Sequence, residues 1–375
     1  MMTDYDLYIN ALIAVRGVGP HTAKLLVNEA GDAKSVFSMS RAEMNAIAGI
    51  GDKTYEYITT QKNEVIEEAK REQDYMNKHA IRQINYTDAA FPLRFNAMLD
   101  GPLAIFVKGE GSLQPQKSLS VVGTRKATDE GKQICTEIVG ALARRFPDLT
   151  IVSGLAYGID ITAHRAALTN NVPTIAVLAH GLDHIYPAAH KNEAALMMEN
   201  GALLTEYRVG TPMERKQFVS RNRLIAALTD ATLVVESSEN GGSMLTMRYA
   251  ASYSREIMAV PGSPLSESFR GCNWAIKTGF AKMVENADDV AAVMNWENDN
   301  EIEKRDNIIE MEQREPLDES EQLLWDVLQT EKDGLTASML SAKMQMPVRN
   351  VNAILFDLEM KERVKAMPGN NYKAI

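Results

Sequence analysis

Cysteine is nearly absent from this chain. Only two cysteines, Cys135 and Cys272, occur among its 375 residues. Two thiols cannot build the disulfide framework of a small secreted domain, and they argue against a structural zinc site. Their scarcity favours a reducing, cytoplasmic compartment, while the 45% share of hydrophobic residues predicts a sizeable core.

Long apolar runs and a targeting signal are also missing. No stretch of the sequence approaches the roughly 18–20 apolar residues that cross a bilayer. Residues 1–6 are acidic and lack the positively charged region that opens a signal peptide. We therefore expect a cytoplasmic protein with no membrane segment.

The signatures of nucleotide cofactors and metal sites are absent too. The chain contains neither Gly-x-Gly-x-x-Gly nor a Gly-Lys-Ser/Thr loop, so it predicts no dinucleotide, no NTP and no other cofactor. His180, His184 and His190 are separated by Gly181 and Pro187, which keeps them off a single helical face. We interpret them as loop histidines and predict no metal site.

An excess of positive charge is likewise lacking, since the net charge is −10. The acidic residues are concentrated, however: residues 296–319 hold ten Asp/Glu and three Lys/Arg, a net −7, which leaves about −3 for the rest. Residues 208–223 hold five Lys/Arg and one Glu. A basic patch for an anionic partner is therefore compatible with the acidic total.

The hydrophobic pattern divides the chain into three folded parts and a linker. We predict a helical domain with two glycine turns, a Rossmann-like domain with a leading extension, an acidic linker and a winged-helix domain, over residues 1–80, 81–295, 296–316 and 317–375. In the first part, residues 64–78 have the pattern of a charged helix.

The second part alternates short apolar runs with helical stretches. Such alternation predicts βαβ units and a parallel sheet covered on both faces. The predicted strands are 119–122, 150–152, 174–178, 202–204, 231–235 and 257–260. Ligands of such sheets bind beyond the carboxyl ends of the strands.

The last part has a different pattern. One helix is indicated by Leu323 to Leu328, a second by Leu335-Thr336 and a third from Pro347 to Glu362. Two short strands around a turn follow at residues 364–372. Three helices and a terminal hairpin predict a winged helix-turn-helix.

Four segments at the predicted carboxyl edge suit an anionic ligand. Small residues let the backbone approach a phosphate, hydroxyls and helix N-termini donate to it, and arginine clamps it. Residues 215–223 mix cations and amides with Phe218, which could stack on a base or belong to the core; the run alone leaves both open. The candidate site residues are Gly123, Thr124, Arg125, Ser153, Gly154, Arg215, Lys216, Phe218, Arg221, Asn222, Arg223, Gly241, Gly242, Ser243 and Thr246.

Catalysis has a weaker basis. Asp160 and His164 lie one helical turn apart and could exchange protons, but no nucleophile accompanies them. We favour a structural role, with Asp160 supporting a helix start and His164 packed locally. Many donors with few acid/base pairs predict a binding protein and not an enzyme.

These residues resemble a known family. Five ordered motifs carry the likeness: Gly123-Thr124-Arg125, Ser153 to His164, Phe218 to Ala226, Gly242 to Thr246 and Ala259-Val260-Pro261-Gly262. Together they resemble DNA-processing protein A (DprA, also called Smf), strongly over residues 115–285 and more loosely beyond. Met247 departs from the smaller residue often found in the family.

The resemblance implies a non-enzymatic single-stranded DNA-binding protein. Members protect incoming DNA in natural transformation, load the recombinase RecA and form homodimers through the Rossmann-like domain. Carried over, Arg125 holds phosphate, Phe218 is the aromatic residue near the pocket, and Arg215 or Lys216 stands for a pocket lysine.

Two alternatives remain. A nucleotide phosphoribohydrolase of the LOG type would need Pro-Gly-Gly-x-Gly-Thr-x-x-Glu, whereas this chain has Met244, Leu245 and Arg248 at the last three fixed positions. A duplex-binding regulator would act through its terminal domains. The N-terminal part resembles paired helix-hairpin-helix (SAM-like) units, which could hold phosphates or contact protein, and acidic residues on the third C-terminal helix favour a contact module.

Overall fold

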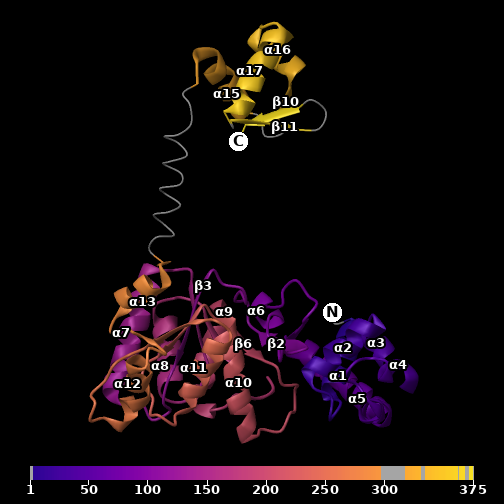
Figure 1. Ribbon diagram of the computed structural model, residues 1–375, viewed down its shortest axis with the longest axis vertical. Coiled ribbons are helices and arrows are strands. Elements are labelled where there is room, and N and C mark those ends of the chain that lie inside the picture. Colours follow the sequence, from indigo (N-terminus) through magenta and orange to yellow (C-terminus); the bar gives the residue numbers. More distant parts are fainter. Residues whose placement is uncertain (1–2, 297–316, 331–333, 362, 368–370, 375) are drawn as a thin grey trace. The chain divides into compact units, whose positions relative to one another are not determined.

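The computed structural model describes residues 3–296, 317–330, 334–361, 363–367 and 371–374. They form two compact units, Met1–Met294 and Asn295–Ile375 (Figure 1). Apart from Trp296, the predicted acidic linker over residues 296–316 lies outside the described residues. In the described part of the chain, no helix is long and apolar enough to cross a membrane.

The N-terminal segment is helical, as predicted. Capping boxes at Thr3/Asp6 and Ser40/Glu43 begin two of its helices, and Gly19 and Gly51 precede two others. The helices are α1 (Asp4–Ala14), α2 (Pro20–Ala30), α3 (Ala33–Val36), α4 (Arg41–Asn45) and α5 (Asp52–Lys78). The charged helix predicted at residues 64–78 is therefore the second half of the longer α5.

A nine-stranded sheet forms the centre of the first unit, in the order β1-β2-β6-β5-β4-β3-β7-β8-β9. β1 and β2 pair antiparallel, as do β2 and β6, and the remaining pairs are parallel. The strands are β1 (Arg82–Asn85), β2 (Ala104–Lys108), β3 (Lys117–Val122), β4 (Leu149–Ser153), β5 (Thr174–Val177), β6 (Ala202–Thr205), β7 (Ala231–Val234), β8 (Glu256–Ala259) and β9 (Lys282–Met283).

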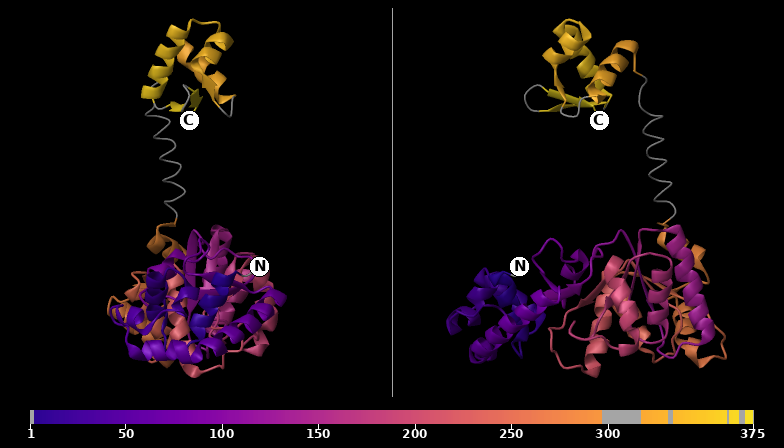
Figure 2. Two further views of the ribbon diagram at one scale, coloured as in Figure 1. Left: turned by 90° about the vertical axis from the view of Figure 1, so that its right-hand side faces the viewer. Right: turned by 180° about the vertical axis from the view of Figure 1, so that it is seen from behind.

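The six predicted strands correspond to β3 through β8, so the Rossmann-like prediction is confirmed. Side chains of β5 alternate between two apolar clusters: Ile175 and Val177 face one, Ala176 the other. Helices cover both faces (Figure 2). They are α6 (Leu93–Asn96), α7 (Asp129–Arg145), α8 (Ile159–Thr169), α9 (Lys191–Asn200), α10 (Arg215–Leu228), α11 (Gly242–Ser252), α12 (Arg270–Lys277) and α13 (Ala287–Met294).

The strand order reverses beside β3. From β3 the chain adds β4, β5 and β6 on one side and then returns to place β7 on the other. The loops that leave β3 and β7 must therefore diverge at the carboxyl edge. This is the switch point at which open α/β sheets place their ligands.

The second unit has the predicted winged-helix elements. They are α15 (Glu319–Gln329), β10 (Leu335–Thr336), α16 (Ala337–Met344), α17 (Val348–Met360), β11 (Val364–Met367) and β12 (Asn371–Ala374). Leu335-Thr336 begins a helix, as predicted, since the Thr336 side chain caps α16; the two residues also pair with β12 as the short strand β10. The unit has its own core, in which Leu324, Leu340 and Leu355 are buried.

Candidate functional site

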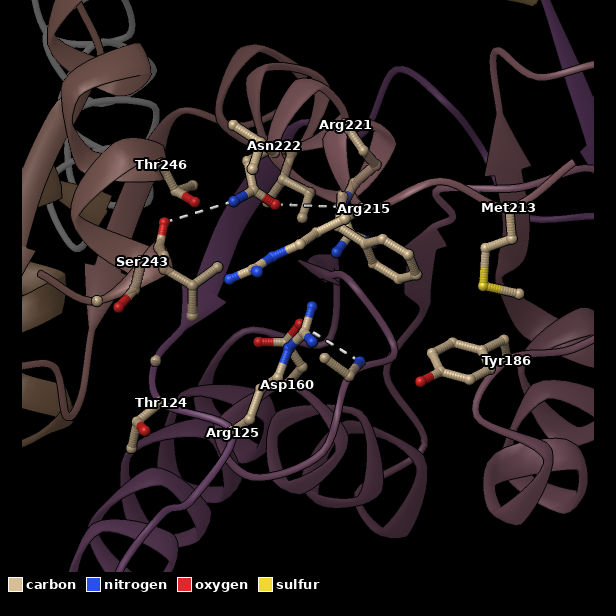
Figure 3. A pocket seen from close by; sticks show the side chains of 18 of the residues that line it. Thr124, Arg125, Asp160, Tyr186, Met213, Arg215, Arg221, Asn222, Ser243 and Thr246 are labelled. Carbon is tan, nitrogen blue, oxygen red and sulfur yellow. Dashed lines mark hydrogen bonds between the residues drawn. The ribbon is translucent and has the colours of Figure 1, made fainter.

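A pocket of about 640 Å³ opens at the switch point of the sheet (Figure 3). The loops after β3, β4 and β7 and one face of α10 surround it. Its lining residues are Val122, Gly123, Thr124, Arg125, Ala156, Asp160, Tyr186, Met213, Glu214, Arg215, Phe218, Val219, Arg221, Asn222, Ile225, Gly241, Gly242, Ser243 and Thr246.

Most of the residues predicted from the sequence meet here. Eleven of the fifteen line the pocket: Gly123, Thr124, Arg125, Arg215, Phe218, Arg221, Asn222, Gly241, Gly242, Ser243 and Thr246. Ser153, Gly154, Lys216 and Arg223 do not. The pocket therefore gathers segments that are more than a hundred residues apart in the chain.

The cationic part of the pocket is formed by Arg125 and Arg215, which are exposed and reach into the space between its walls (Figure 3). The guanidinium of Arg125 lies over the ring of Phe218, 5.3 Å from its centroid. Phe218 is half-buried and lines the pocket, so the alternative of a core side chain is wrong. A cation and an aromatic face are thus presented together to the same space.

Gly158 lets two loops approach each other. Its φ is +78°, and a Cβ added there would lie 2.1 Å from the carbonyl oxygen of Thr124 and 2.9 Å from Cα of Arg125. The amide of Ile159 also donates to that Thr124 carbonyl at 3.3 Å. The loop after β4 thereby supports the loop that carries Arg125. Only glycine at position 158 permits the two backbones to approach so closely.

The opposite wall is made by the start of α11. Gly241 precedes the helix, Gly242 begins it, and the side chains of Ser243 and Thr246 face the pocket (Figure 3). The Ser243 hydroxyl donates to Ser237 Oγ at 2.7 Å, which fixes its rotamer. Free backbone N–H groups at a helix start suit a phosphate oxygen, whereas the Ser243 hydroxyl already donates its proton to Ser237.

Arg221 lies in the floor of the pocket and is almost completely buried. Its Nη1 donates to the carbonyl oxygens of Gly154, at 2.8 Å, and of Val177. Burial lowers the pKa of Arg221 to about 10, against the opposing attraction of Asp160. The guanidinium remains charged at neutral pH and ties α10 to the ends of β4 and β5.

Two of the four predicted residues outside the pocket lie behind that floor. Ser153 is buried and donates to the carbonyl oxygen of Val121 at 2.7 Å. A Cβ on Gly154 would lie 2.5 Å from the guanidinium of Arg221, so glycine makes room for that side chain. Both residues shape the site without facing it.

The other two, Lys216 and Arg223, do not line the pocket. Lys216 is exposed and pairs with Glu214 at 2.7 Å. Arg223 is buried and pairs with Glu206 and, at 3.3 Å, with Asp100. The structure therefore does not bring these two cations into the predicted surface, because they project from other faces of α10.

Asp160 and His164 support the loop after β4. Asp160 accepts from the amides of Gly154 and Ala156, at 3.2 and 3.4 Å. His164 is completely buried, its Nδ1 lies 2.7 Å from the Thr174 hydroxyl, and burial lowers the pKa of His164 to about 3. A neutral, enclosed imidazole agrees with the structural role inferred from the sequence.

The histidines after β5 are spread through one loop. His180 and His184 stack with ring centroids 4.4 Å apart, while His190 Nδ1 lies 2.8 Å from the carbonyl oxygen of Leu155. Over the described ranges, no group of three His, Cys, Asp or Glu could hold a metal ion. These contacts anchor the loop against its neighbour.

Sequence reasoning missed several lining residues, of which Tyr186, Met213, Glu214 and Val219 are exposed. Tyr186 lies between β5 and α9, and its ring meets Phe218 edge to face at 5.8 Å. Its position in a loop that follows a predicted strand was the available signal. Met213 and Glu214 lie in the loop between β6 and α10, so the same signal applied to them.

Comparison with known proteins gives consistent matches. The family model "DNA recombination-mediator protein A" matches residues 82–295, and the "DprA winged helix domain" model matches residues 310–370. The protein Smf of Synechocystis is 31% identical over 286 residues, covering 74% of this chain and 70% of its own. DNA processing protein DprA of Streptococcus pneumoniae is 36% identical over 205 residues, covering 55% and 71%.

A DprA of Mycobacterium tuberculosis is 40% identical over 191 residues; the match spans half of this chain and 48% of that protein. Among solved structures, DprA of S. pneumoniae aligns with a TM-score of 0.63 and 28% identity, over 78% of this chain and 98% of the other. DprA of Helicobacter pylori, described for its single-stranded DNA binding mode, aligns with a TM-score of 0.52 and 28% identity, over 58% and 96%.

Proposed function

The chain belongs to the DNA recombination-mediator protein A (DprA/Smf) family, and from this premise we propose that it binds single-stranded DNA in the pocket at the carboxyl edge of its sheet. The observation that carries the proposal is the convergence of Arg125, Phe218 and the start of α11 on one space. Cations there would follow the phosphates while the ring stacks on a base.

The pocket suits an unpaired strand better than a duplex. A half-buried ring can stack only on a base that is not enclosed in a double helix. The glycines of the loops and the first turn of α11 offer backbone donors to phosphate without reading a sequence. We therefore propose binding with little sequence preference.

We propose further that the chain is not an enzyme. The carboxylates that line the pocket have structural partners: Asp160 accepts from two loop amides, and Glu214 pairs with Lys216. Arg248 stands where LOG-type hydrolases have their glutamate, and it is exposed. Release of free base from a nucleoside monophosphate would revive the hydrolase alternative.

The cellular role follows from the family. We propose that the chain protects single strands and loads RecA onto them in natural transformation, acts as a homodimer and works in the cytoplasm. We propose that the chain divides into domains at the boundaries predicted from the sequence, which are 1–80, 81–295, 296–316 and 317–375. The winged helix is proposed as a contact module, because Asp357 and Glu359 on α17 disfavour duplex DNA. For the N-terminal helices, phosphate binding and protein contact both stay open.

The test is a titration of labelled oligonucleotides, single-stranded against duplex, with the wild type and Arg125→Ala. We expect preference for the single strand and a logarithm of affinity that falls with that of salt by about 0.7 per phosphate contact. Arg125→Ala should weaken binding at least tenfold, since roughly 1.4 kcal/mol of phosphate contact is lost. Lys70→Ala removes a charge from α5 and serves as the matched control. Unchanged affinity of Arg125→Ala would reject the pocket.

A further inference from the structure

Two tyrosines at the border of the pocket are unusually exposed for their size. Tyr186 is 44% exposed and Tyr157 is 49% exposed. Neither hydroxyl has a hydrogen-bond partner among the described side chains and backbone, so no polar contact in this unit accounts for their positions. Large aromatic faces left open beside a binding pocket need a physical reason.

Each ring is held from the side. Tyr186 meets the ring of Phe218 edge to face, with centroids 5.8 Å apart and planes at 69°. Tyr157 meets the ring of His190 in the same manner, at 4.9 Å and 69°. His190 is buried and fixed by the Leu155 carbonyl, so it forms a rigid support. Edge contacts of this kind orient a ring and leave a face open.

Both rings belong to the surroundings of the pocket. Tyr186 lines it opposite Ser243 and Thr246 (Figure 3). Tyr157 follows Ala156, which also lines it, and precedes Gly158, whose backbone packs against Arg125. Tyr186 and the support of Tyr157, His190, come from the same connection between β5 and α9. Tyr186 thus extends the aromatic surface that begins at Phe218, and Tyr157 adds a second exposed ring, supported by the same connection.

We propose that Tyr186 and Tyr157 form an aromatic shelf that stacks the nucleobases of an unpaired strand next to the nucleotide held in the pocket. The proposal rests on the proposed function and extends it, because it defines the path by which the strand leaves the pocket. Base–aromatic stacking accepts any base, so the shelf adds affinity without sequence preference. Exposed Lys126 and Lys191 flank the loops that carry the shelf and place positive charge near the strand.

The first test compares oligonucleotide lengths with the full chain. Tyr157→Ala should weaken binding of an oligothymidine of about 20 nucleotides roughly tenfold, the loss of one stacked base. It should leave binding of a mononucleotide such as thymidine 3′,5′-bisphosphate, which has no neighbouring base to stack on the shelf, unaffected. Tyr157→Phe retains the ring and should bind both as the wild type does. Tyr57→Ala, at a similarly exposed tyrosine on α5, is the control for loss of any surface ring.

The second test locates the contact directly. Oligonucleotides that carry a single 5-iodouracil are photocrosslinked to the wild-type chain, and the modified residues are identified by mass spectrometry. One position of 5-iodouracil in the oligonucleotide is expected to label Phe218. Labelling of Tyr186 or Tyr157 from the positions next to it would support the shelf. If Arg125→Ala weakens binding while Tyr157→Ala and Tyr186→Ala do not, and no tyrosine is labelled, the shelf is rejected and the pocket stands. If the wild type ignores single strands at low salt, the proposed function fails with it.

Discussion

The guanidinium of Arg125 lies 5.3 Å from the centroid of the Phe218 ring. The first residue comes from the loop after β3 and the second from α10, so the sheet topology brings them together. The contact holds the cation over an aromatic face that is also open to the pocket. Arg125 could therefore bind a phosphate while Phe218 stacks on the neighbouring base, and the contact between the two side chains already restricts the position of each.

This relationship predicts coupling between the two residues. Arg125→Ala and Phe218→Ala should each weaken single-strand binding about tenfold, and the double variant should lose less than the product of the two. A coupling free energy of roughly 0.5–1 kcal/mol is expected for an exposed cation–π pair. Fluorescence anisotropy with a labelled oligonucleotide measures the cycle. Strict additivity would mean that the two side chains act on the strand separately.

Glycine at position 158 should be essential because of contact and not only because of its backbone conformation. Gly158→Ala must displace the Thr124–Arg125 backbone, since the new Cβ would lie 2.1 Å from Thr124 O. Gly210→Ala is the matched control, with a φ of +74° and nothing within 4 Å. A residue other than glycine at positive φ costs about 1–2 kcal/mol of unfolding free energy, and the ψ of −125° at Gly158, outside the left-handed helical region, adds to that cost. Gly158→Ala should lose more, and it alone should weaken DNA binding. Equal effects of the two would show that the loop contact is unimportant.

Arg221 should matter for stability more than its neighbours on α10. Arg221→Met removes the donor to two buried carbonyl oxygens and leaves Asp160 without the cation. We expect the free energy of unfolding to fall by about 3 kcal/mol, as for a broken buried charge interaction. Lys216→Met changes an exposed cation on the same helix and should alter it by less than about 0.5 kcal/mol. Urea unfolding followed by circular dichroism compares them. A small loss for Arg221→Met would contradict its anchoring role.

The sequence was sufficient for the parallel strands and for the loops that leave them. β3 through β8 are short apolar runs between helical stretches, a pattern that buried parallel strands must have. β1, β2 and β9 were not predicted. β1 and β9 lie at the two edges of the sheet and are partly exposed, so they lack a continuous apolar run. β2 is a buried apolar run like the predicted strands, but no helix separates it from β3, so it falls outside the alternating pattern.

The sequence was sufficient to predict the residues of the site, but not the face of α10 on which each one lies. Arg215, Phe218 and Asn222 recur at helical spacing and share the pocket, whereas Lys216 and Arg223 lie on other faces. Treating residues 215–223 as one basic run hid this difference. The buried ion pair between Arg223 and Glu206 could not be predicted from the sequence, because it depends on where β6 ends relative to α10.

His164 should make stability depend on pH in a defined window. Burial lowers its pKa from 6.5 to about 3, so between these values the unfolded chain binds a proton that the folded chain does not. The contribution of the neutral imidazole is therefore complete above pH 6.5 and is lost as the pH falls, by about 1.4 kcal/mol per pH unit. His164→Gln removes this titration. Its deficit in unfolding free energy relative to the wild type should shrink by about 2–3 kcal/mol between pH 6.5 and 4.5.

Subtracting the unfolding free energy of the variant from that of the wild type cancels the contributions of the other titrating groups. One of these is Glu206, whose pKa is raised by burial. Urea unfolding at several pH values in this window measures the difference. His21→Gln changes an exposed histidine on α2 and serves as the control for a histidine substitution at the surface. A constant deficit for His164→Gln across the window would mean that this imidazole can take up a proton without leaving its place between Thr174 and the amide of Leu155.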